Sequence, residues 1–304
     1  MSIIFMGTPE FAVASLAALI DAKEKIVAVV TAPDKPAGRG QKLHESAVKK
    51  YAKTRNLPIL QPTNLKDPVF LETLKSFGAD LQVVVAFRML PEIVWNMPRM
   101  GTINLHGSLL PQYRGAAPIN HAIINGETET GVSTFLLEHE IDTGKILFSQ
   151  RVPILPDDNA EQLHDKLMIT GAQLLVKTVK ALKGGTAKGQ AQSNNIQLKS
   201  APKIHKNDCK IDWEKPVNEV YNFIRGLSPY PTAFTSLSGK NLKIFAALSE
   251  KAPVSEKPGT TLSDGKTFLK FACQDGYIHV TDLQIQDKKR MNIADFLRGF
   301  KFDS

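Results

Sequence analysis

An amide side chain and an imidazole stand two residues apart in the segment 104–111, which reads Asn-Leu-His-Gly-Ser-Leu-Leu-Pro. A carboxylate, Asp142, follows 36 positions after His106. An amide N–H and an imidazolium can stabilise the oxyanion of a tetrahedral intermediate. An imidazole held by a carboxylate can also move a proton between two nitrogens. Asn104, His106 and Asp142 therefore fit the transfer of a small acyl group to an amine.

Each of these residues also has a structural interpretation. A lone histidine near an apolar strand more often serves packing than catalysis, and an Asp-Thr-Gly turn can simply close a loop. The i, i+2 pairing and the turn that follows favour function for Asn104 and His106, whereas Asp142 has less support. Ser108 lacks the Gly-x-Ser-x-Gly elbow of a nucleophilic serine. Its segment is better explained as an apolar ledge with backbone donors.

The elements that must position these residues alternate between strands and helices in the first half of the chain. We expect strands at residues 2–7, 25–31, 79–87 and 101–106, and helices near 9–20, 45–54, 68–77 and 159–182. This alternation predicts an open, mostly parallel α/β sheet. Ligands of such sheets bind beyond the carboxyl ends of the strands. Asn104 and His106 lie at such an end, and alternation places them on one face.

The turn after the first strand reads Gly-Thr-Pro-Glu-Phe at residues 7–11 and lacks the Gly-x-Gly-x-x-Gly spacing of dinucleotide sites. An NAD-dependent oxidoreductase is therefore disfavoured. Residues 34–42 form a basic segment rich in glycine and proline, where Arg39 and Lys42 could contact phosphate. An ordinary solvated loop explains the same composition.

The second half begins with a polar, glycine-rich stretch that predicts a linker over residues 184–204. Beyond it we expect a helix at 213–226 and short strands at 233–237, 242–247, 267–272 and 277–283. Short strands at this spacing predict a small barrel. The expected domains are therefore residues 1–183 and 205–304, joined by the linker.

Composition limits the class of protein. Hydrophobic residues make up 42% and charged residues 22%, as in ordinary globular proteins. No apolar run approaches the roughly 20 residues of a membrane span, and the N-terminus does not resemble a secretory signal, so we expect a cytoplasmic protein without a membrane partner. Two cysteines, Cys209 and Cys273, rule out a disulfide framework. The remaining histidines lack metal-ligand spacing, so no metal site is expected.

The net charge of +8 lies almost entirely in the last part of the chain. Residues 1–180 hold 19 Lys and Arg against 18 Asp and Glu, a net of +1. Residues 181–304 hold 19 against 12, a net of +7. A basic region beside a neutral one indicates a polyanionic partner, most simply nucleic acid. A solvated lysine-rich surface accounts for the charge equally well.

Motifs along essentially the whole chain resemble the methionyl-tRNA formyltransferase family. They lie at residues 5–11, 33–42, 104–111, 113–119, 131–133, 142–144, 201–204, 211–213, 229–231 and 295–299. The Asn-x-His…Asp set resembles that of enzymes that use 10-formyltetrahydrofolate. The start of the sequence, the Arg39 loop and the basic C-terminal region point to the member that acts on tRNA.

The resemblance implies a Rossmann-like formyltransferase sheet followed by a smaller OB-like β-barrel domain. It implies transfer of the formyl group of 10-formyltetrahydrofolate to the α-amine of methionine on initiator Met-tRNA, for translation initiation. Asn104 and His106 would stabilise the oxyanion, and Asp142 would keep His106 charged or relay protons through water. Arg39, supported by Lys42, would reach the acceptor end of the tRNA, and the basic C-terminal domain would hold the acceptor arm.

The resemblance also implies where the folate lies. A ledge for it would be formed by Ser108, Leu109, Leu110 and Pro111. The pterin would be read by the backbone at Phe87, Arg88, Met89 and Leu90. Here the sequence departs from the family, because many members carry a tyrosine-glycine pair at this strand end.

In this scheme the folate is a co-substrate, so no tightly bound cofactor is implied. Whether a metal takes part is left open, and magnesium could accompany the tRNA. A monomer is expected. Another 10-formyltetrahydrofolate-dependent transformylase or hydrolase, acting on a small substrate, would use the same three residues without needing the basic region. A non-catalytic nucleic-acid-binding protein would tolerate the loss of Asn104, His106 and Asp142.

Overall fold

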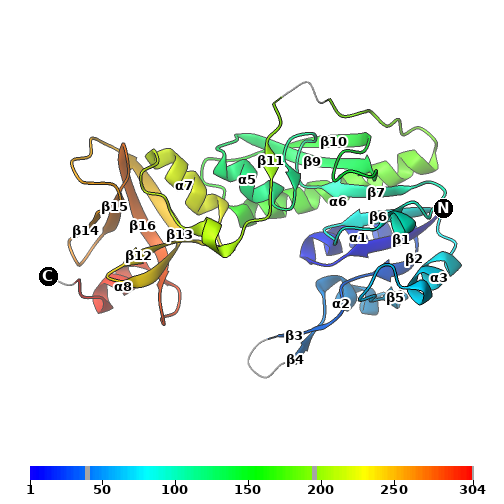
Figure 1. The fold of residues 1–304 in the computed structure, drawn as a ribbon, viewed down its shortest axis with the longest axis horizontal. Helices are drawn as coiled ribbons and strands as arrows, with labels where there is room; N and C mark the ends of the chain where they lie inside the picture. Colours follow the sequence, from blue (N-terminus) through cyan, green and yellow to red (C-terminus); the bar gives the residue numbers. More distant parts are fainter. Residues whose placement is uncertain (38–41, 194–196, 303–304) are drawn as a thin grey trace. The chain divides into compact units, whose positions relative to one another are not determined.

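The computed structural model describes residues 1–37, 42–193 and 197–302 (Figure 1). The chain forms two compact units, and neither is continuous in sequence. Unit 1 comprises Met1–Gly115, Thr130–Val152 and His164–Ser200. Unit 2 comprises Ala116–Glu129, Pro153–Leu163 and Ala201–Ser304. The limits 183/184 and 204/205 expected from the sequence stay a prediction. In the structure, the two earlier segments Ala116–Glu129 and Pro153–Leu163 also pack within unit 2.

A seven-stranded sheet with the order β10-β9-β7-β6-β1-β2-β5 forms the centre of unit 1. The five strands from β7 to β5 are parallel, and β9 runs antiparallel to β7. The open, mostly parallel sheet predicted from the sequence is therefore confirmed. Its strands are β1 (Ser2–Gly7), β2 (Lys25–Val30), β5 (Ile59–Leu60), β6 (Leu81–Val85), β7 (Thr102–His106), β9 (Glu129–Leu136) and β10 (Ile146–Pro153).

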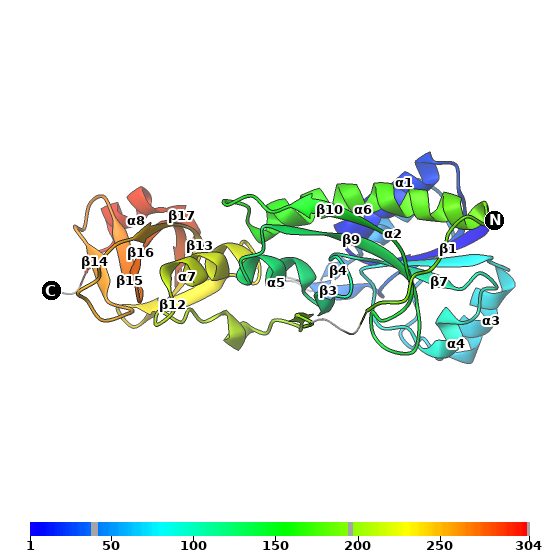
Figure 2. The ribbon, with the colours of Figure 1, turned by 90° about the horizontal axis from the view of Figure 1, so that it is seen from above.

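Helices cover both faces of this sheet. Figure 2 shows α1 and α6 on one face and α3 and α4 on the other. Successive side chains along each strand point to opposite faces of the sheet. Ile4, Met6 and Val84 therefore pack in one cluster with residues of α3 and α4, whereas Leu105 lies on the other face, against Gly171 of α6. The helices are α1 (Glu10–Asp21), α2 (Ala47–Thr54), α3 (Pro68–Ser76), α4 (Glu92–Trp95) and α6 (Ala160–Lys183).

The segment expected as an irregular basic loop contains a short hairpin. Its strands are β3 (Lys35–Ala37) and β4 (Lys42–His44), which pair antiparallel. The three-residue strands were not predicted, because proline and glycine in this segment favour a turn or loop over a strand. Arg39 lies outside the described residues, and for Lys42 only the backbone is described. Two further short strands, β8 (Arg114–Gly115) and β11 (Ser200–Ala201), pair with each other.

Unit 2 is built on an antiparallel sheet with the order β12-β13-β16-β15-β14, with β17 paired to β16. This half-barrel confirms the second, smaller β domain expected from the strand spacing. Its strands are β12 (Ala233–Leu237), β13 (Lys240–Lys251), β14 (Thr261–Ser263), β15 (Leu269–Ala272), β16 (Gly276–Ile285) and β17 (Met291–Asn292). Its helices are α5 (Pro118–Ile124), the 3-10 turn η1 (Lys206–Cys209), α7 (Val217–Gly226) and α8 (Ile293–Gly299).

The helix expected from residue 213 begins four residues later, because Pro216 occupies its N-cap position. Trp213 instead packs as part of the core of unit 2. Its ring stacks on Phe271 at 4.6 Å between centroids, and its Nε1 donates to the hydroxyl of Thr235 at 3.0 Å. Among the described helices, none is long and apolar enough to cross a membrane.

Candidate active site

Strand β7 carries Asn104 and His106 to the carboxyl end of the sheet. Its odd-numbered residues face α6, as the contact of Leu105 with Gly171 shows. Its even-numbered residues face the other way, since the hydroxyl of Thr102 donates to the carbonyl of Trp95 in α4 at 2.6 Å. Asn104 and His106 therefore share one face, as alternation along the strand predicts.

The imidazole of His106 has neighbours on both ring nitrogens. It is buried, with 7% of the residue exposed. Its Nε2 lies 2.8 Å from the carbonyl oxygen of Tyr113, and because a carbonyl only accepts, Nε2 carries the proton. Its Nδ1 lies 3.7 Å from Oδ2 of Asp142. This is longer than a hydrogen bond, but it is within ion-pair range when the ring is protonated.

Asp142 lies in the loop between β9 and β10, and its backbone is left-handed, with φ +56°. Its Oδ2 accepts a hydrogen bond from the backbone N–H of Gly115 at 3.0 Å. Two residues on, a Cβ at Gly144 would lie 1.6 Å from the carbonyl oxygen of Leu136. The glycine is thus required for the turn to lie against the end of β9, and this turn directs the carboxylate toward His106.

The amide of Asn104 has no hydrogen-bonding partner among the residues that the structure describes. The residue is neither fully buried nor exposed. A buried or half-buried amide is usually satisfied within the protein. An amide left unpaired at the end of a parallel strand can donate to a bound ligand. Of the predicted residues, the structure thus brings Asn104, His106 and Asp142 together at one strand end and the loop beside it.

The turn 108–111 is held internally by hydrogen bonds. The Ser108 hydroxyl, which is buried, donates to the carbonyl of Gln112 at 2.6 Å. The Leu110 N–H donates to Oγ of Ser133 at 3.1 Å, and that hydroxyl donates to the Ser108 carbonyl at 2.8 Å. The N–H of Leu110 is therefore bonded within the protein, and the role of this ledge in folate binding stays a prediction. Leu109 and Pro111 remain half-buried at the ledge.

The segment 87–90 leaves β6 beside β7, since Val85 pairs with Leu105. Leu90 is buried in the cluster under the sheet, whereas Met89 is 72% exposed. The Arg88 guanidinium donates to the carbonyls of Pro62 and Thr63, the latter at 2.9 Å, and burial lowers its pKa. It also lies 5.7 Å from the centre of the Phe87 ring. Phe87 and Arg88 thus form one structured edge near the carboxyl ends of β6 and β7.

Sequence reasoning missed several residues that support this site. Tyr113 and Gly115 make their contacts through backbone atoms, whereas Ser133 and Gln192 make theirs through side-chain hydrogen bonds of 2.8 Å. Tyr113 and Gly115 lay inside a recognised motif, but nothing in the pattern around Gln192 indicated a role. Within the described ranges, no group of three or more His, Cys, Asp or Glu side chains could hold a metal ion.

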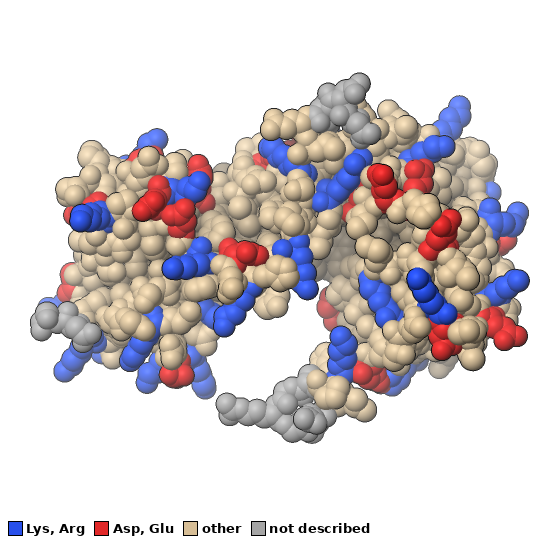
Figure 3. Space-filling model, viewed as in Figure 1, with Lys and Arg blue, Asp and Glu red and all other residues tan. Residues whose placement is uncertain are grey.

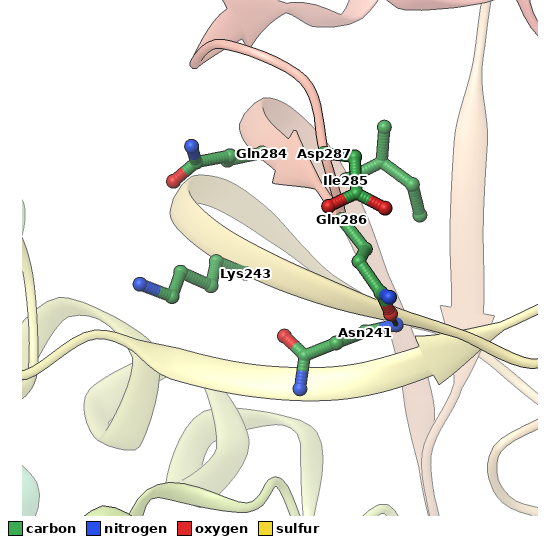
Figure 4. Close-up of a pocket in the computed structure, with 6 residues that line it drawn as sticks. All are labelled: Asn241, Lys243, Gln284, Ile285, Gln286 and Asp287. Carbon is green, nitrogen blue, oxygen red and sulfur yellow. Dashed lines mark hydrogen bonds between the residues drawn. The ribbon is translucent and has the colours of Figure 1, made fainter.

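A separate pocket lies in unit 2, between β13 and the end of β16 (Figure 4). It is lined by Asn241, Lys243, Gln284, Ile285, Gln286 and Asp287. These side chains offer amides and single charges but no imidazole, thiol or pair of carboxylates. The residues at the end of β7 are therefore better suited to acid–base chemistry than the residues that line this pocket.

Comparison with known proteins covers both units. The family described as "Formyl transferase" matches residues 1–179, and "Formyl transferase, C-terminal domain" matches residues 203–301. The chain is 53% identical over 311 residues to the methionyl-tRNA formyltransferase of Bacteroides thetaiotaomicron, covering 99% of this chain and 96% of that one. It is 51% identical over 306 residues to the enzyme of the same name from Flavobacterium johnsoniae, covering 99% and 97%.

Solved structures share the fold at lower identity. WlaRD, a sugar 3N-formyl transferase crystallised in the presence of dTDP and 5-N-formyl-THF, has a TM-score of 0.67 and 21% identity, covering 95% of this chain and 99% of that chain. HypX from Aquifex aeolicus, in complex with tetrahydrofolic acid, has a TM-score of 0.67 and 17% identity, covering 99% and 48%. At these identities the likeness concerns the fold alone.

Proposed function

The chain belongs to the methionyl-tRNA formyltransferase family, and we propose that Asn104, His106 and Asp142 form its catalytic centre. It transfers the formyl group of 10-formyltetrahydrofolate to the α-amine of methionine on initiator Met-tRNA. One observation supports the proposed centre most strongly. The buried His106 ring has its Nδ1 3.7 Å from the Asp142 carboxylate, on the strand that also presents the unpaired Asn104 amide.

In the proposed mechanism the methionine amine attacks the formyl carbon, and the carbonyl oxygen becomes an oxyanion. The Asn104 N–H and the His106 imidazolium stabilise this charge, which develops only on the way to the tetrahedral intermediate. Asp142 stabilises the imidazolium by its negative charge. The intermediate collapses when the bond from the formyl carbon to the folate nitrogen breaks. The proton lost by the amine is passed to that nitrogen, through His106 or a water molecule.

We propose that the folate lies at the carboxyl edge of the sheet, between the ledge 108–111 and the segment 87–90. Leu109 and Pro111 offer half-buried apolar surface there, and Ser108 and Leu110 shape the turn. The backbone of Phe87, Arg88, Met89 and Leu90 would read the pterin. Two structures with the same fold are described with tetrahydrofolates. The folate is a co-substrate, so the proposal includes no tightly bound cofactor, and magnesium could accompany the tRNA.

We propose that the tRNA is bound by Arg39 and Lys42 of the β3–β4 hairpin segment and by the basic surface of unit 2. Figure 3 shows Lys and Arg side chains gathered along the lower edge of unit 2. These charges can neutralise backbone phosphates in a sequence-independent way. We also propose that the enzyme is a cytoplasmic monomer, in which Asn104, His106 and Asp142 form the catalytic centre.

A formylation assay tests the proposed function. The purified chain is incubated with Met-tRNA and 10-formyltetrahydrofolate, and the product is followed on acid gels or by mass spectrometry. A parallel incubation replaces Met-tRNA with a nucleotide-linked amino sugar. We expect formyl-Met-tRNA and no formylated sugar. A folded, folate-binding sample that formylates only the sugar would assign the chain to another acceptor.

Arg39→Ala tests the contact to tRNA. Loss of one phosphate-binding cation should raise KM for Met-tRNA while the Kd for folate stays unchanged. Arg55→Ala, which removes the same charge from the exposed C-cap of α2, is the matched control and should leave both constants unchanged. Equal loss of tRNA and folate binding in Arg39→Ala would instead indicate a role in folding.

A further inference from the structure

Gln192 joins two sides of the proposed active site through four hydrogen bonds. Its Nε2 donates to the carbonyl oxygens of Asp142 and Gly144, each at 2.8 Å. Its Oε1 accepts from Nε and Nη2 of Arg114, at 3.1 and 2.6 Å. A primary amide has two N–H donors and two acceptor positions. The whole capacity of the Gln192 side chain is therefore used, which fixes its orientation.

Gln192 links the Asp142–Gly144 turn to Arg114, and these two segments are also joined directly at the Asp142 carboxylate. Asp142 holds a left-handed backbone, with φ +56°, which is uncommon outside glycine and must be supported by its surroundings. Gln192 binds the carbonyl of this strained residue. On the other side, Arg114 precedes Gly115, whose N–H donates to the Asp142 carboxylate at 3.0 Å. Gln192 thus connects the acceptor of this hydrogen bond to its donor.

Described residues near Gln192 in the sequence also bond to Tyr113, whose carbonyl is the partner of the other ring nitrogen of His106. The Tyr113 N–H donates to the carbonyl of Lys199 at 2.6 Å, and the Tyr113 carbonyl accepts from Nε2 of His106 at 2.8 Å. Earlier in the segment, Gln190 and Ile146 exchange two backbone hydrogen bonds of 2.8 Å. The stretch that follows α6 is therefore bonded to the neighbours of both ring nitrogens of His106.

We propose that Gln192 is a positioning residue for formyl transfer, which holds Asp142 in place beside His106. The inference rests on the proposed function, in which Asp142 acts on His106. A segment predicted as a linker would then be part of the framework of the active site. Gln192 does not touch the reacting atoms, so its effect passes through the Asp142 turn.

The test begins with Gln192→Met, which keeps the length of the side chain and removes all four hydrogen bonds. A displaced catalytic group can cost up to about 100-fold in rate, and we expect kcat to fall by about 10-fold or more with KM for folate unchanged. Gln192→Glu keeps the acceptor for Arg114 but cannot donate to the two carbonyls, so it should be as slow as Gln192→Met. Gln190→Met changes an exposed side chain without a hydrogen bond in the described structure and should match the wild type. Wild-type kcat in folded Gln192→Met or Gln192→Glu would overturn the proposal.

A double-mutant cycle separates this proposal from the one on which it depends. Asp142→Asn is combined with Gln192→Met, and kcat is measured for each single variant and for the double variant. If Gln192 acts through Asp142, the second substitution adds no loss in the Asp142→Asn background. Losses that multiply would overturn the role of Gln192 alone. Wild-type kcat in Asp142→Asn would overturn the catalytic assignment and this inference with it.

Discussion

At the scale of single residues, His106 and Asp142 of the proposed centre are hydrogen-bonded by the Tyr113 carbonyl and the Gln192 amide. The positions of Asn104 and His106 could be predicted from alternation at the end of a buried strand, but these two partners could not. The carbonyl of Tyr113 binds Nε2 of His106, and a backbone atom of a residue with φ +59° carries no signal in the sequence. Gln192 was equally hidden, because its role depends on contacts with residues about 50 and 80 positions away.

Asn104→Ala tests the donor on β7. Loss of one oxyanion donor typically lowers kcat by about 10²–10³-fold, and we expect a loss of that size with KM for folate little changed. Single-turnover formylation at saturating substrates measures it. Asn104→Asp, which keeps the shape but replaces the N–H donor by an acceptor, should be at least as slow. Activity in Asn104→Asp equal to the wild type would remove the amide from the mechanism.

At the scale of elements, the four longer parallel strands of unit 1 could be predicted, namely β1, β2, β6 and β7. The two-residue strand β5 and the antiparallel strands of unit 1 could not. Strands such as β6 are continuous apolar runs, which the sequence displays directly. Strand β9 instead buries hydroxyls: Thr134 bonds to Thr178 of α6 at 2.8 Å, and Ser133 bonds to the turn at Ser108. A strand whose buried residues are polar shows no alternation of hydrophobic and polar residues, so the sequence pattern does not reveal it. This strand, with β10, frames the loop that carries Asp142.

Gly144→Ala tests whether this loop must be tight. Because the new Cβ would meet the Leu136 carbonyl, the turn must open and move Asp142. We expect a loss of stability of about 1–3 kcal/mol, the usual cost of overpacking, together with a lower kcat. Urea unfolding and single-turnover assays measure the two effects. Gly184→Ala, whose new Cβ would meet only ordinary contacts at 3.5 Å or more, is the control. Wild-type kcat in Gly144→Ala would show that the loop tolerates opening.

At the scale of the whole molecule, two units and one charge asymmetry were predictable from composition and strand spacing. The sequence could not show that segments 116–129 and 153–163 pack with the C-terminal unit. Those contacts are tertiary: a Cβ at Gly226 of α7 would lie 2.7 Å from Ile124 of α5. In the proposed function, the net charge of +7 in residues 181–304 is the physical basis for binding the tRNA. It concerns affinity for a polyanion, not the chemistry.

The salt dependence of binding tests this role of the charge. Contacts to several phosphates release counterions, so tRNA affinity should fall by about tenfold or more between roughly 50 and 200 mM salt. Folate affinity, measured on the same samples, is the internal control and should change little. A Kd for Met-tRNA that is the same at both salt concentrations would contradict phosphate binding by the basic surface.

The proposed function depends above all on His106, at the end of β7. The most direct measurement is the single-turnover rate of formyl-Met-tRNA formation by His106→Ala, at saturating Met-tRNA and 10-formyltetrahydrofolate. Folate binding and the unfolding midpoint of the variant serve as checks on its integrity. We expect a rate lower than wild type by roughly two or more orders of magnitude, the scale of a lost acid–base and oxyanion group. A folded, folate-binding variant that forms the product at the wild-type rate would contradict it.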